Sequence, residues 1–327
     1  MALLQTTYNI NLETFEVTIA LLIIVVAFYL RRNYTLKKSK LKLEKIIKER
    51  TAELKHKELE ITDSIKYALK IQLSIIPSPE RFKTLLPNSF VLYKPKDIVS
   101  GDFYWIDKVG DDVLFSAVDC TGHGVPGAMM SVIGLKSLNQ ATQDKQLSNP
   151  ADILQHLDIS VNDTLRQSSD ENSVKDGMDL ALCSINYKTS KLNYAGVFNS
   201  LWIVRKNIAS TYTIKTNREV LYGEDLLEIK GDKSYIGNNA NGVADTFTNH
   251  TFDLLPNDNI YIFTDGFADQ FGGEKGKKYK YKALKDILIE YAVFEPEVQK
   301  QKLEQAFNTW KGNLEQVDDV LIIGIKI

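Results

Sequence analysis

Five aspartates lie beside apolar runs of the kind that form buried strands. The pairings are Asp102 before "FYWIDKV", Asp119 at the end of "VLFSAVD", Asp265 after "NIYIFT", and Asp318 with Asp319 before "VLIIGIKI". One such acid beside a glycine is usually only a turn. Several together repel one another unless cations neutralise them. Because the set offers oxygen ligands and no histidine or cysteine cluster, hard ions such as Mg²⁺ or Mn²⁺ fit best. The acids therefore indicate a metal site.

The stretch "VDCTGHGVPGAMMS", residues 118–131, places Asp119 at the head of a turn with three glycines. Glycine has no Cβ, so these positions are expected to let the backbone pass close to the ions before a helix starts at Ala128. The three are Gly122, Gly124 and Gly127. The stretch thus predicts a loop that presents an acid and then leads into a helix.

A second acidic turn, "DGMD", contains Asp176 and Asp179 and precedes another apolar run. A purely structural turn is the favoured interpretation of this pair, because Asp and Gly together are typical turn residues. Contact with a metal ion or with substrate is the alternative. The composition of the turn does not distinguish the two.

The acids need a scaffold of strands and helices, and the hydrophobic pattern supplies one. Short apolar runs predict strands at 89–95, 102–109, 112–119, 178–187, 191–197, 200–206, 259–266 and 319–327. Amphipathic spacing predicts helices at 126–141, 150–167, 281–292 and 297–311. The stretch 217–249 is poorly patterned. Strands, a helix pair, more strands, then helices and a closing strand indicate an α+β fold.

Composition excludes some classes of protein. The 327-residue chain has a net charge of -2, which argues against a general nucleic-acid binder. Its two cysteines, Cys120 and Cys183, make neither a disulfide framework nor a zinc-ligand pattern. They are typical of a reducing compartment.

The apolar segment "VTIALLIIVVAFYL", residues 17–30, is followed by a basic run. Between Arg31 and Lys57 there are eleven Lys or Arg and three Glu. The first sixteen residues contain no Lys or Arg, unlike the start of a signal peptide. Basic residues on the cytoplasmic side favour a membrane anchor over an apolar helix docked on the protein. The predicted location is the cytoplasmic membrane, with a single span and the rest of the chain in the cytoplasm.

No proline or glycine occurs between Tyr34 and Ile76, which predicts one long helix. Two heptad series run along it. The first, apolar throughout, is Ile47, Leu54, Ile61, Ala68 and Ile75, and the second, polar in its middle, is Leu43, Arg50, Lys57, Ser64 and Ile71. One good series favours a homodimer through this helix, with a rigid spacer as the alternative. Three prolines in 77–89 mark the boundary to the next domain.

Six ordered motifs resemble those of the metal-dependent protein phosphatases, and more narrowly of their bacterial SpoIIE/RsbU branch. They are "KPKDIVSGDFYWID", "VDCTGHGVPGAMMS", "DGMDLALCSI", "YAGVFNSLWI", "IYIFTDGFADQFG" and "QVDDVLIIGIK". The preceding "YALKIQLSIIPSP" is similar to the helix that leads into the catalytic domain of that branch. The resemblance covers about residues 65–327.

The resemblance implies a four-layer αββα sandwich that holds two Mn²⁺ or Mg²⁺ ions at one end of its sheets. Asp119 would bridge both ions, and the backbone carbonyl of Cys120 would add a ligand. Asp102 and Asp265 match the acids of the Gly-Asp and Asp-Gly motifs. Asp318 matches the first acid of the closing pair.

Three further residues have open roles under the same resemblance. Asp319 is the alternative to its neighbour as a ligand, since a shift of one residue exchanges them. Asp269 falls where some members bind a weaker third ion. His123 would orient water or donate a proton to the leaving oxygen, or else simply cap the glycine turn.

The implied organisation and activity follow. The expected parts are a short extracytoplasmic segment (1–14), a transmembrane anchor (15–32), a signalling helix (33–76) and a phosphatase domain (77–327). A metal-activated water would hydrolyse phosphoserine or phosphothreonine on a regulatory protein, of the anti-sigma-factor antagonist type. The alternatives are a degenerate domain that acts as a membrane-tethered scaffold and a hydrolase of small phosphoesters. The complete acid set favours an active enzyme.

Overall fold

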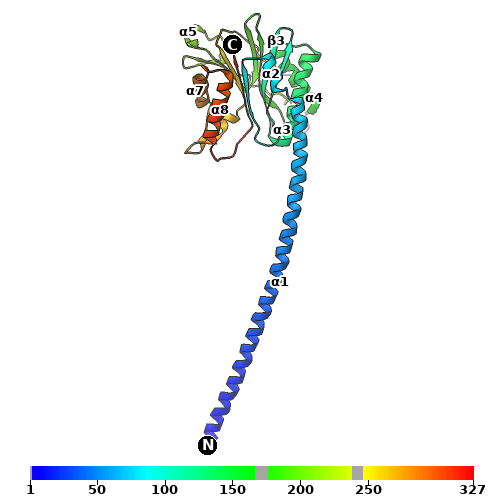
Figure 1. Ribbon diagram of the computed structural model, residues 1–327, viewed down its shortest axis with the longest axis vertical. Coiled ribbons are helices and arrows are strands. Elements are labelled where there is room, and N and C mark those ends of the chain that lie inside the picture. Colours follow the sequence, from blue (N-terminus) through cyan, green and yellow to red (C-terminus); the bar gives the residue numbers. More distant parts are fainter. Residues whose placement is uncertain (1, 166–175, 238–245) are drawn as a thin grey trace. The chain divides into compact units, whose positions relative to one another are not determined.

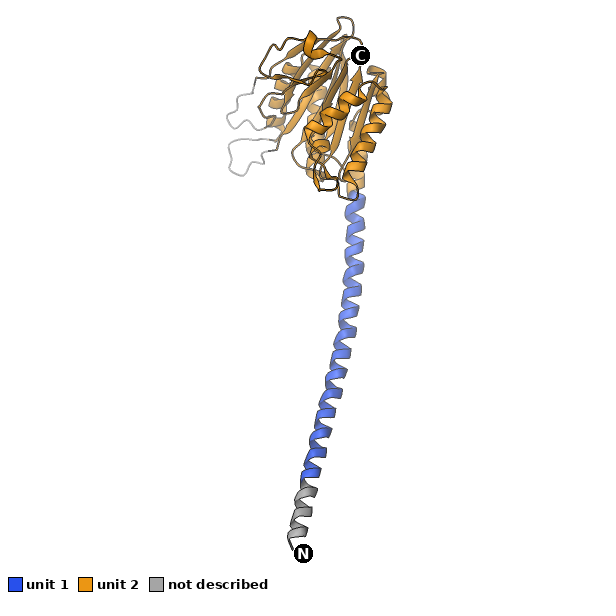
Figure 2. Ribbon diagram, turned by 90° about the vertical axis from the view of Figure 1, so that its left-hand side faces the viewer, with its two compact units in different colours: residues 1–64 blue, residues 65–327 orange. Residues whose placement is uncertain are grey.

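A computed structural model describes residues 2–165, 176–237 and 246–327, with side chains from residue 14 onward. The chain divides into two compact units, residues 1–64 and 65–327 (Figure 2). Helix α1 (Ala2–Ile75) makes up the first unit and contributes its last residues to the second. The helix ends just before Pro77, as its prolines predict. The second unit begins at Ile65, earlier than the boundary expected at residue 77.

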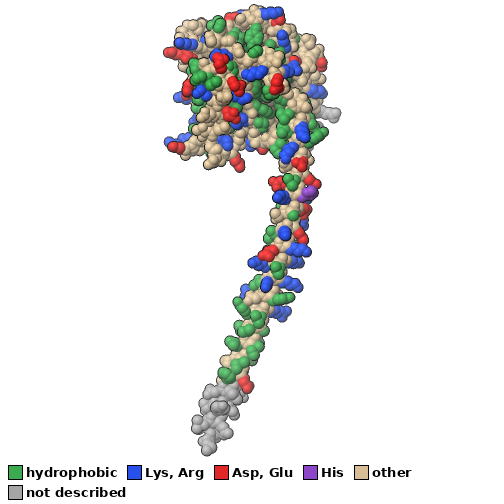
Figure 3. All heavy atoms as spheres, viewed as in Figure 1, with side chains coloured by type: hydrophobic (Ala, Val, Ile, Leu, Met, Phe, Trp, Pro, Cys, Tyr) green, Lys and Arg blue, Asp and Glu red, His purple; other side chains and the backbone are tan. Residues whose placement is uncertain are grey.

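Between residues 14 and 64, where the structure describes its side chains, the helical first unit buries no apolar residue. Among the described residues, α1 is the one helix whose length and composition would allow it to cross a membrane, with a window of mean hydropathy 2.0 that no part of the structure buries. Figure 3 shows hydrophobic side chains along the first part of its described surface and Lys and Arg side chains beyond them. The order of apolar and basic segments is therefore that of the predicted anchor.

Two antiparallel sheets form the centre of the second unit, in the strand orders β1-β13-β10-β6-β8-β7 and β2-β3-β4-β5-β9. Their strands are β1 (Ser89–Lys94), β2 (Phe103–Val109), β3 (Asp112–Cys120), β4 (Met178–Asn186), β5 (Lys191–Val197), β6 (Leu201–Val204), β7 (Glu219–Tyr222), β8 (Leu226–Ile229), β9 (His250–Asp253), β10 (Asn259–Phe263) and β13 (Val320–Lys326). A separate hairpin pairs β11 (Phe271–Gly272) with β12 (Lys277–Lys278). The helices are α2 (Pro79–Leu85), α3 (Gly124–Asn139), a π-helical turn (Gln140–Asp144), α4 (Pro150–Leu165), α5 (Ile208–Thr211), α6 (Gly266–Asp269), α7 (Tyr281–Tyr291) and α8 (Pro296–Lys311).

The sheets pack face to face and helices cover their outer faces. Apolar residues of both sheets join those of α3 and α4 in one core, which includes Phe103, Leu154 and Ile262. Helices α7 and α8 cover the other face of the larger sheet, where Leu288 and Phe307 are buried. Figure 1 shows α7 and α8 on one side of the sheets and α3 and α4 on the other. The predicted α+β, four-layer αββα sandwich is confirmed.

Strand β13 illustrates why the long apolar runs of the sequence form central strands. Its first six residues are all buried, since one face meets the other sheet and the other face meets α8. Such a strand needs apolar side chains on both faces, and "VLIIGI" provides them. Each predicted strand and helix has a counterpart, although the end of the helix predicted at 150–167 lies outside the described residues.

The elements that the pattern did not predict are short. Helix α2 was not expected, although Ser78 caps it by accepting a hydrogen bond from the Arg81 amide and Pro79 occupies its first turn. Strands β7 and β8 lie in the stretch 217–249 that resisted assignment. Four-residue strands carry too little alternation to stand out from a loop.

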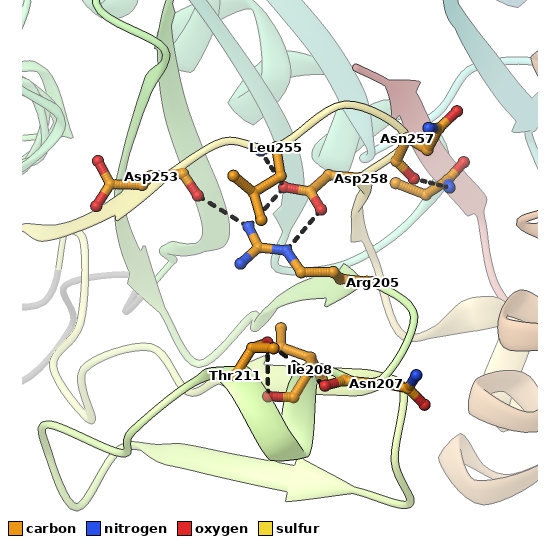
Figure 4. A network of polar contacts seen from close by, with 9 residues as sticks. Arg205, Asn207, Ile208, Thr211, Asp253, Leu255, Asn257 and Asp258 are labelled. Atoms are coloured by element: carbon orange, nitrogen blue, oxygen red, sulfur yellow. Dashed lines mark hydrogen bonds and ion pairs between the residues drawn. The ribbon is translucent and has the colours of Figure 1, made fainter.

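A buried ion pair fixes the start of β10. Arg205, just after β6, donates from Nε and Nη2 to both carboxylate oxygens of Asp258, at 2.7 and 2.6 Å. The same Nη2 donates to the carbonyl of Asp253 at 2.8 Å, at the end of β9 (Figure 4). The Asp258 side chain is completely buried. Strand β10 is thereby anchored at the end opposite to the one that carries Asp265.

Candidate metal centre

Three acids come together at one end of the smaller sheet. Phe103 pairs with Val118, so Asp102 at the start of β2 lies beside Asp119 at the end of β3. On the other side of β3, Asp119 pairs directly with Asp179 of β4. Antiparallel pairing thus gathers carboxyls that are distant in the sequence.

The larger sheet brings two more acids to its matching end. Strand β10 stops at Phe263, and β13 starts at Val320, so the segments that carry Asp265 and Asp318 leave the same edge of the sheet. The Thr264 amide donates to the carbonyl of Leu321 at 3.0 Å, which holds the two segments together.

Electrostatic coupling shows that the two sets of acids share one region. Burial raises the pKa of Asp119 well above its ordinary value, and the charges of Asp265, Asp318 and Asp179 raise it further. Burial, followed by the charge of Asp119, likewise raises the pKa of Asp102. These carboxyls therefore favour a neutral form unless a cation compensates their charges.

The pKa values of two neighbouring acids, Asp265 and Asp179, are raised as well. Burial raises the pKa of Asp265 to about 6, with contributions from Asp318 and Asp269, and the Lys278 charge opposes the shift. Burial and the Asp265 charge raise the pKa of Asp179 to about 6. Both acids are thus poised to release protons near neutral pH.

The donor chemistry fits a hard divalent cation. Asp102 is only 3% exposed, and its Oδ2 is buried with no hydrogen-bond partner among the described residues. A buried carboxylate oxygen of this kind is costly unless a cation or donor meets it. Within the described ranges, no three His, Cys, Asp or Glu side chains form a closed ligand set. The fit consequently rests on the oxygen donors and on the unpaired Asp102 oxygen rather than on a preformed shell.

Asp318 and Asp319 have different surroundings. The Asp319 carboxylate accepts hydrogen bonds from the amides of Lys96, Gly101 and Asp102, at 2.7, 2.8 and 3.4 Å. Its oxygens are therefore occupied in holding the turn that carries Asp102. Asp318 Oδ1 accepts a hydrogen bond from the Asp319 amide at 2.9 Å. The Asp318 charge raises the pKa of Asp119 and of Asp265, whereas both the Asp319 and the Asp318 charges raise the pKa of Asp102. The difference at Asp119 and Asp265 supports the expectation that Asp318 is the ligand.

Asp269, the candidate ligand for a third ion, already has a cationic partner. It lies one helical turn after Asp265, and its amide donates to the Asp265 carbonyl at 3.0 Å. Lys278 of β12 places its Nζ 2.7 Å from Asp269 Oδ2. A lysine ammonium thus neutralises this carboxylate.

His123 lies at the rim of the site. It precedes the first residue of α3 and makes no side-chain cap hydrogen bond, so it does not cap the helix through its ring. Its Nδ1 lies 2.7 Å from Oδ2 of Asp97, an acid that the sequence analysis did not select. The pairing fixes the ring and leaves its other nitrogen unused by this contact.

The glycine turn packs on itself more than expected. Helix α3 begins at Gly124, four residues before the predicted Ala128. A Cβ on Gly127 would lie 2.3 Å from the carbonyl oxygen of Gly122 and 2.9 Å from Cα of Gly101. Gly122 itself has a φ of +83°, which favours glycine. A side chain at Gly127 would clash with these atoms, so this glycine allows close contact between the turn and the Asp102 loop.

Asp179 lies in the strand predicted at 178–187 and not in the turn that precedes it. The residue belongs to β4 and faces Asp119 across the strand pair, because β4 begins immediately after Gly177. An acid at the start of an apolar strand was the available signal, the same one that identified Asp102. Asp176 lies outside the strand.

Comparison with known proteins places this arrangement in context. Residues 110–327 match the family described as stage II sporulation protein E (SpoIIE). The SiaA-PP2C domain of Pseudomonas aeruginosa is similar, with 29% identity and a TM-score of 0.70 over 83% of this chain and 98% of that chain. No curated protein matches the chain.

Two more distant structures share the fold. The PP2C phosphatase domain and regulatory-domain fragment of SpoIIE from Bacillus subtilis is 14% identical, with a TM-score of 0.54 over 73% of this chain and 62% of that chain. The RsbU and RsbW domains of a Mycobacterium tuberculosis protein are 16% identical, with a TM-score of 0.51 over 74% and 60%. At these identities the likeness concerns the fold alone.

Proposed function

The chain belongs to the SpoIIE family, and from that membership we propose that it is a serine/threonine protein phosphatase acting on a phosphorylated regulatory protein. Its fold is that of the PP2C-like phosphatases. The observation that carries the proposal is the group of coupled acids at one end of the two sheets, with an unpaired buried oxygen on Asp102.

The proposed cofactors are two Mn²⁺ or Mg²⁺ ions. Asp102, Asp119, Asp265, Asp318 and the backbone carbonyl of Cys120 would hold them. When bound, such ions lower the pKa of a water molecule and neutralise charge on the phosphoryl oxygens. The acids would contribute by staying ionised around the ions, which would neutralise the repulsion among their carboxylates.

The other residues of the chain fit hydrolysis without a covalent phosphoenzyme. Burial raises the pKa of both thiols, Cys120 and Cys183, so neither is a thiolate nucleophile near neutral pH. His123, oriented by Asp97, would give a proton to the departing serine or threonine oxygen. The mechanism thus needs one activated water and one proton donor.

Phosphate release from phosphoserine peptides in Mn²⁺ tests the proposal. Wild-type protein should release phosphate, chelation by EDTA should stop it, and Asp119→Asn should abolish it while the protein stays folded. Release by Asp119→Asn at the wild-type rate would refute the role of Asp119. No release by wild-type protein would favour the alternative, a degenerate domain that works as a scaffold.

The adjacent acids can be separated by matched variants. We expect Asp318→Asn to lose Mn²⁺ binding by direct loss of a ligand. Asp319→Asn should keep much of that affinity but unfold at a lower temperature, because it weakens the hydrogen bonds to three backbone amides. Equal, mild losses of metal affinity in both variants would mean that neither is a ligand.

We further propose that α1 anchors the phosphatase in the cytoplasmic membrane and pairs with a second copy. The apolar window and the basic run that follows support the anchor. Ile47, Leu54 and Ile61, all exposed in the single chain, support pairing along residues 34–76. Full-length protein in the soluble fraction after gentle lysis would reject the anchor, and a monomeric 34–327 fragment at high concentration would reject the dimer.

A further inference from the structure

A small cavity adjoins the acids and has no role in the proposed chemistry. It measures about 300 Å³ and is lined by Asp179, Met178, Ile236, Phe198, Tyr235 and the Thr121 segment. Asp179 belongs to both the cavity and the acid cluster, where it pairs with Asp119. The Cα atoms of such a pair lie about 5 Å apart. The cavity therefore begins directly beside the reaction centre.

Backbone hydrogen bonds and a β-bridge hold the floor of the cavity together. The Thr121 amide donates to the Gly177 carbonyl at 3.0 Å, and the Gly177 amide donates to Thr121 Oγ1 at 3.2 Å. Met178 pairs with Ile236 in an isolated β-bridge, and both side chains are buried. The cavity is consequently a feature of the folded domain and not a gap left by a loose side chain.

Phe198 forms part of the wall in an unfavourable backbone conformation. Its φ is +55°, and the Asn199 amide donates to the Val197 carbonyl at 2.6 Å, a turn of the rare positive-φ γ type. The Phe198 amide donates to the Asp232 carbonyl at 3.0 Å, which holds the turn in place. Strained residues that the surrounding structure holds in place occur preferentially at functional sites.

The strained turn exposes an aromatic pair. Phe198 is 41% exposed and Tyr235 is 55% exposed, and their ring centroids lie 5.3 Å apart. Neither residue belongs to the hydrophobic cores of the described domain. Exposed aromatic residues beside a pocket are typical of surfaces that bind a protein partner.

We propose that this cavity is a subsite for the phosphoprotein substrate and that it takes an aliphatic side chain within two residues of the phosphorylated serine or threonine. The proposal rests on the phosphatase function proposed above. The Phe198 and Tyr235 rings supply the accessible apolar wall, and the Asp179 carboxylate disfavours an acidic occupant. In an extended peptide, side chains two residues apart point to the same face about 7 Å from each other. Because the cavity begins at Asp179, which pairs with Asp119, a side chain at that spacing would reach it from a phosphate placed over the acids.

The test uses synthetic phosphoserine peptides that differ at one position, from two residues before to two residues after the phosphoserine. Each position carries Leu, Gly or Glu in turn, and phosphate release is measured in Mn²⁺ as kcat/KM. We expect wild-type protein to prefer Leu over Gly by about tenfold or more at one position, the usual discrimination of an apolar pocket. Glu at that position should be the poorest substrate.

Two variants examine the walls. Phe198→Gly accepts the positive φ without strain, so it keeps the turn while it removes the ring. Phe198→Gly and Tyr235→Ala should both reduce the preference for Leu to within about twofold of Gly. Tyr187→Ala, which removes an exposed tyrosine beyond the far end of β4, should keep the wild-type preference.

The outcomes separate the subsite from the activity. Equal kcat/KM for Leu, Gly and Glu peptides at all four positions, or a preference that survives in both wall variants, overturns the subsite while the phosphatase function stands. No release from any peptide by wild-type protein overturns the phosphatase function, and the subsite with it.

Discussion

Replacing Asp119 by asparagine should stabilise the metal-free protein while it abolishes the response to metal. The Asp119 carboxyl is partly buried among the charges of Asp265, Asp318 and Asp179 and beside Asp102. Asparagine keeps the shape of the side chain and removes its charge. The variant therefore relieves repulsion in the apo form and removes the ligand proposed to bridge the ions.

The size of the effect follows from Coulomb's law. Two unit charges 5–8 Å apart repel by about 2–3 kcal/mol at an effective dielectric constant of 20. The acids partly avoid this repulsion by binding protons, so we expect the free energy of unfolding to rise by about 1–3 kcal/mol. For a domain of this size, that raises Tm by roughly 3–10 °C.

The assay is thermal unfolding of the purified chain at pH 7.5, in EDTA and in Mn²⁺. Mn²⁺ at about 100 times its Kd should stabilise wild-type protein by about 2.7 kcal/mol and leave Asp119→Asn unchanged. Asp111→Asn is the matched control, since that acid lies on the surface in an ion pair with Lys188. It should shift Tm by less than about 2 °C and keep the metal response. An apo Tm for Asp119→Asn below the wild-type value would refute the repulsion argument.

Three more predictions concern other parts of the domain. Arg205→Met should lower the free energy of unfolding by about 3–5 kcal/mol, because it leaves the fully buried Asp258 carboxylate without its ion partner; a loss under 1 kcal/mol in urea unfolding would contradict this. Gln72→Leu should lower the free energy of unfolding by about 1–3 kcal/mol. The reason is that the buried Gln72 amide donates to the Ser100 carbonyl at 2.6 Å and to Ser131 Oγ at 2.9 Å. An unchanged Tm would contradict this prediction. The pKa values of Asp265 and Asp179, about 6, lie above the ordinary value of 3.8. Between these values the folded state binds more protons than the unfolded state. The metal-free protein should therefore lose stability as the pH rises from about 4 to 6. Mn²⁺ affinity should rise over the same interval, and a Tm in EDTA that increases from pH 4 to pH 6 would exclude these shifts.

Much of the scaffold could be predicted from local patterns. The apolar runs of β3, β10 and β13 are long enough and flanked clearly enough to identify central strands, and the helical spacing of α7 and α8 is equally plain. Short strands such as β7 were not predicted, because four residues provide too little periodicity. The start of α3 was misplaced, since the glycines suggested a loop where the backbone already forms a helix.

The sequence by itself indicated the candidate acids Asp102, Asp119, Asp265 and Asp318, because acids at the ends of apolar strands are visible without coordinates. It also determined the order of apolar, basic and helical segments in α1, which depends only on composition along the chain. Which acids lie next to one another, and which of them bind backbone amides, was decided by the tertiary structure. Strand register sets Asp179 opposite Asp119, and the turn geometry gives the Asp319 oxygens to backbone amides and leaves the Asp318 charge facing the other acids. Such contacts join residues that are up to 223 positions apart, and only the pairing and packing of the two sheets bring them within reach of one another.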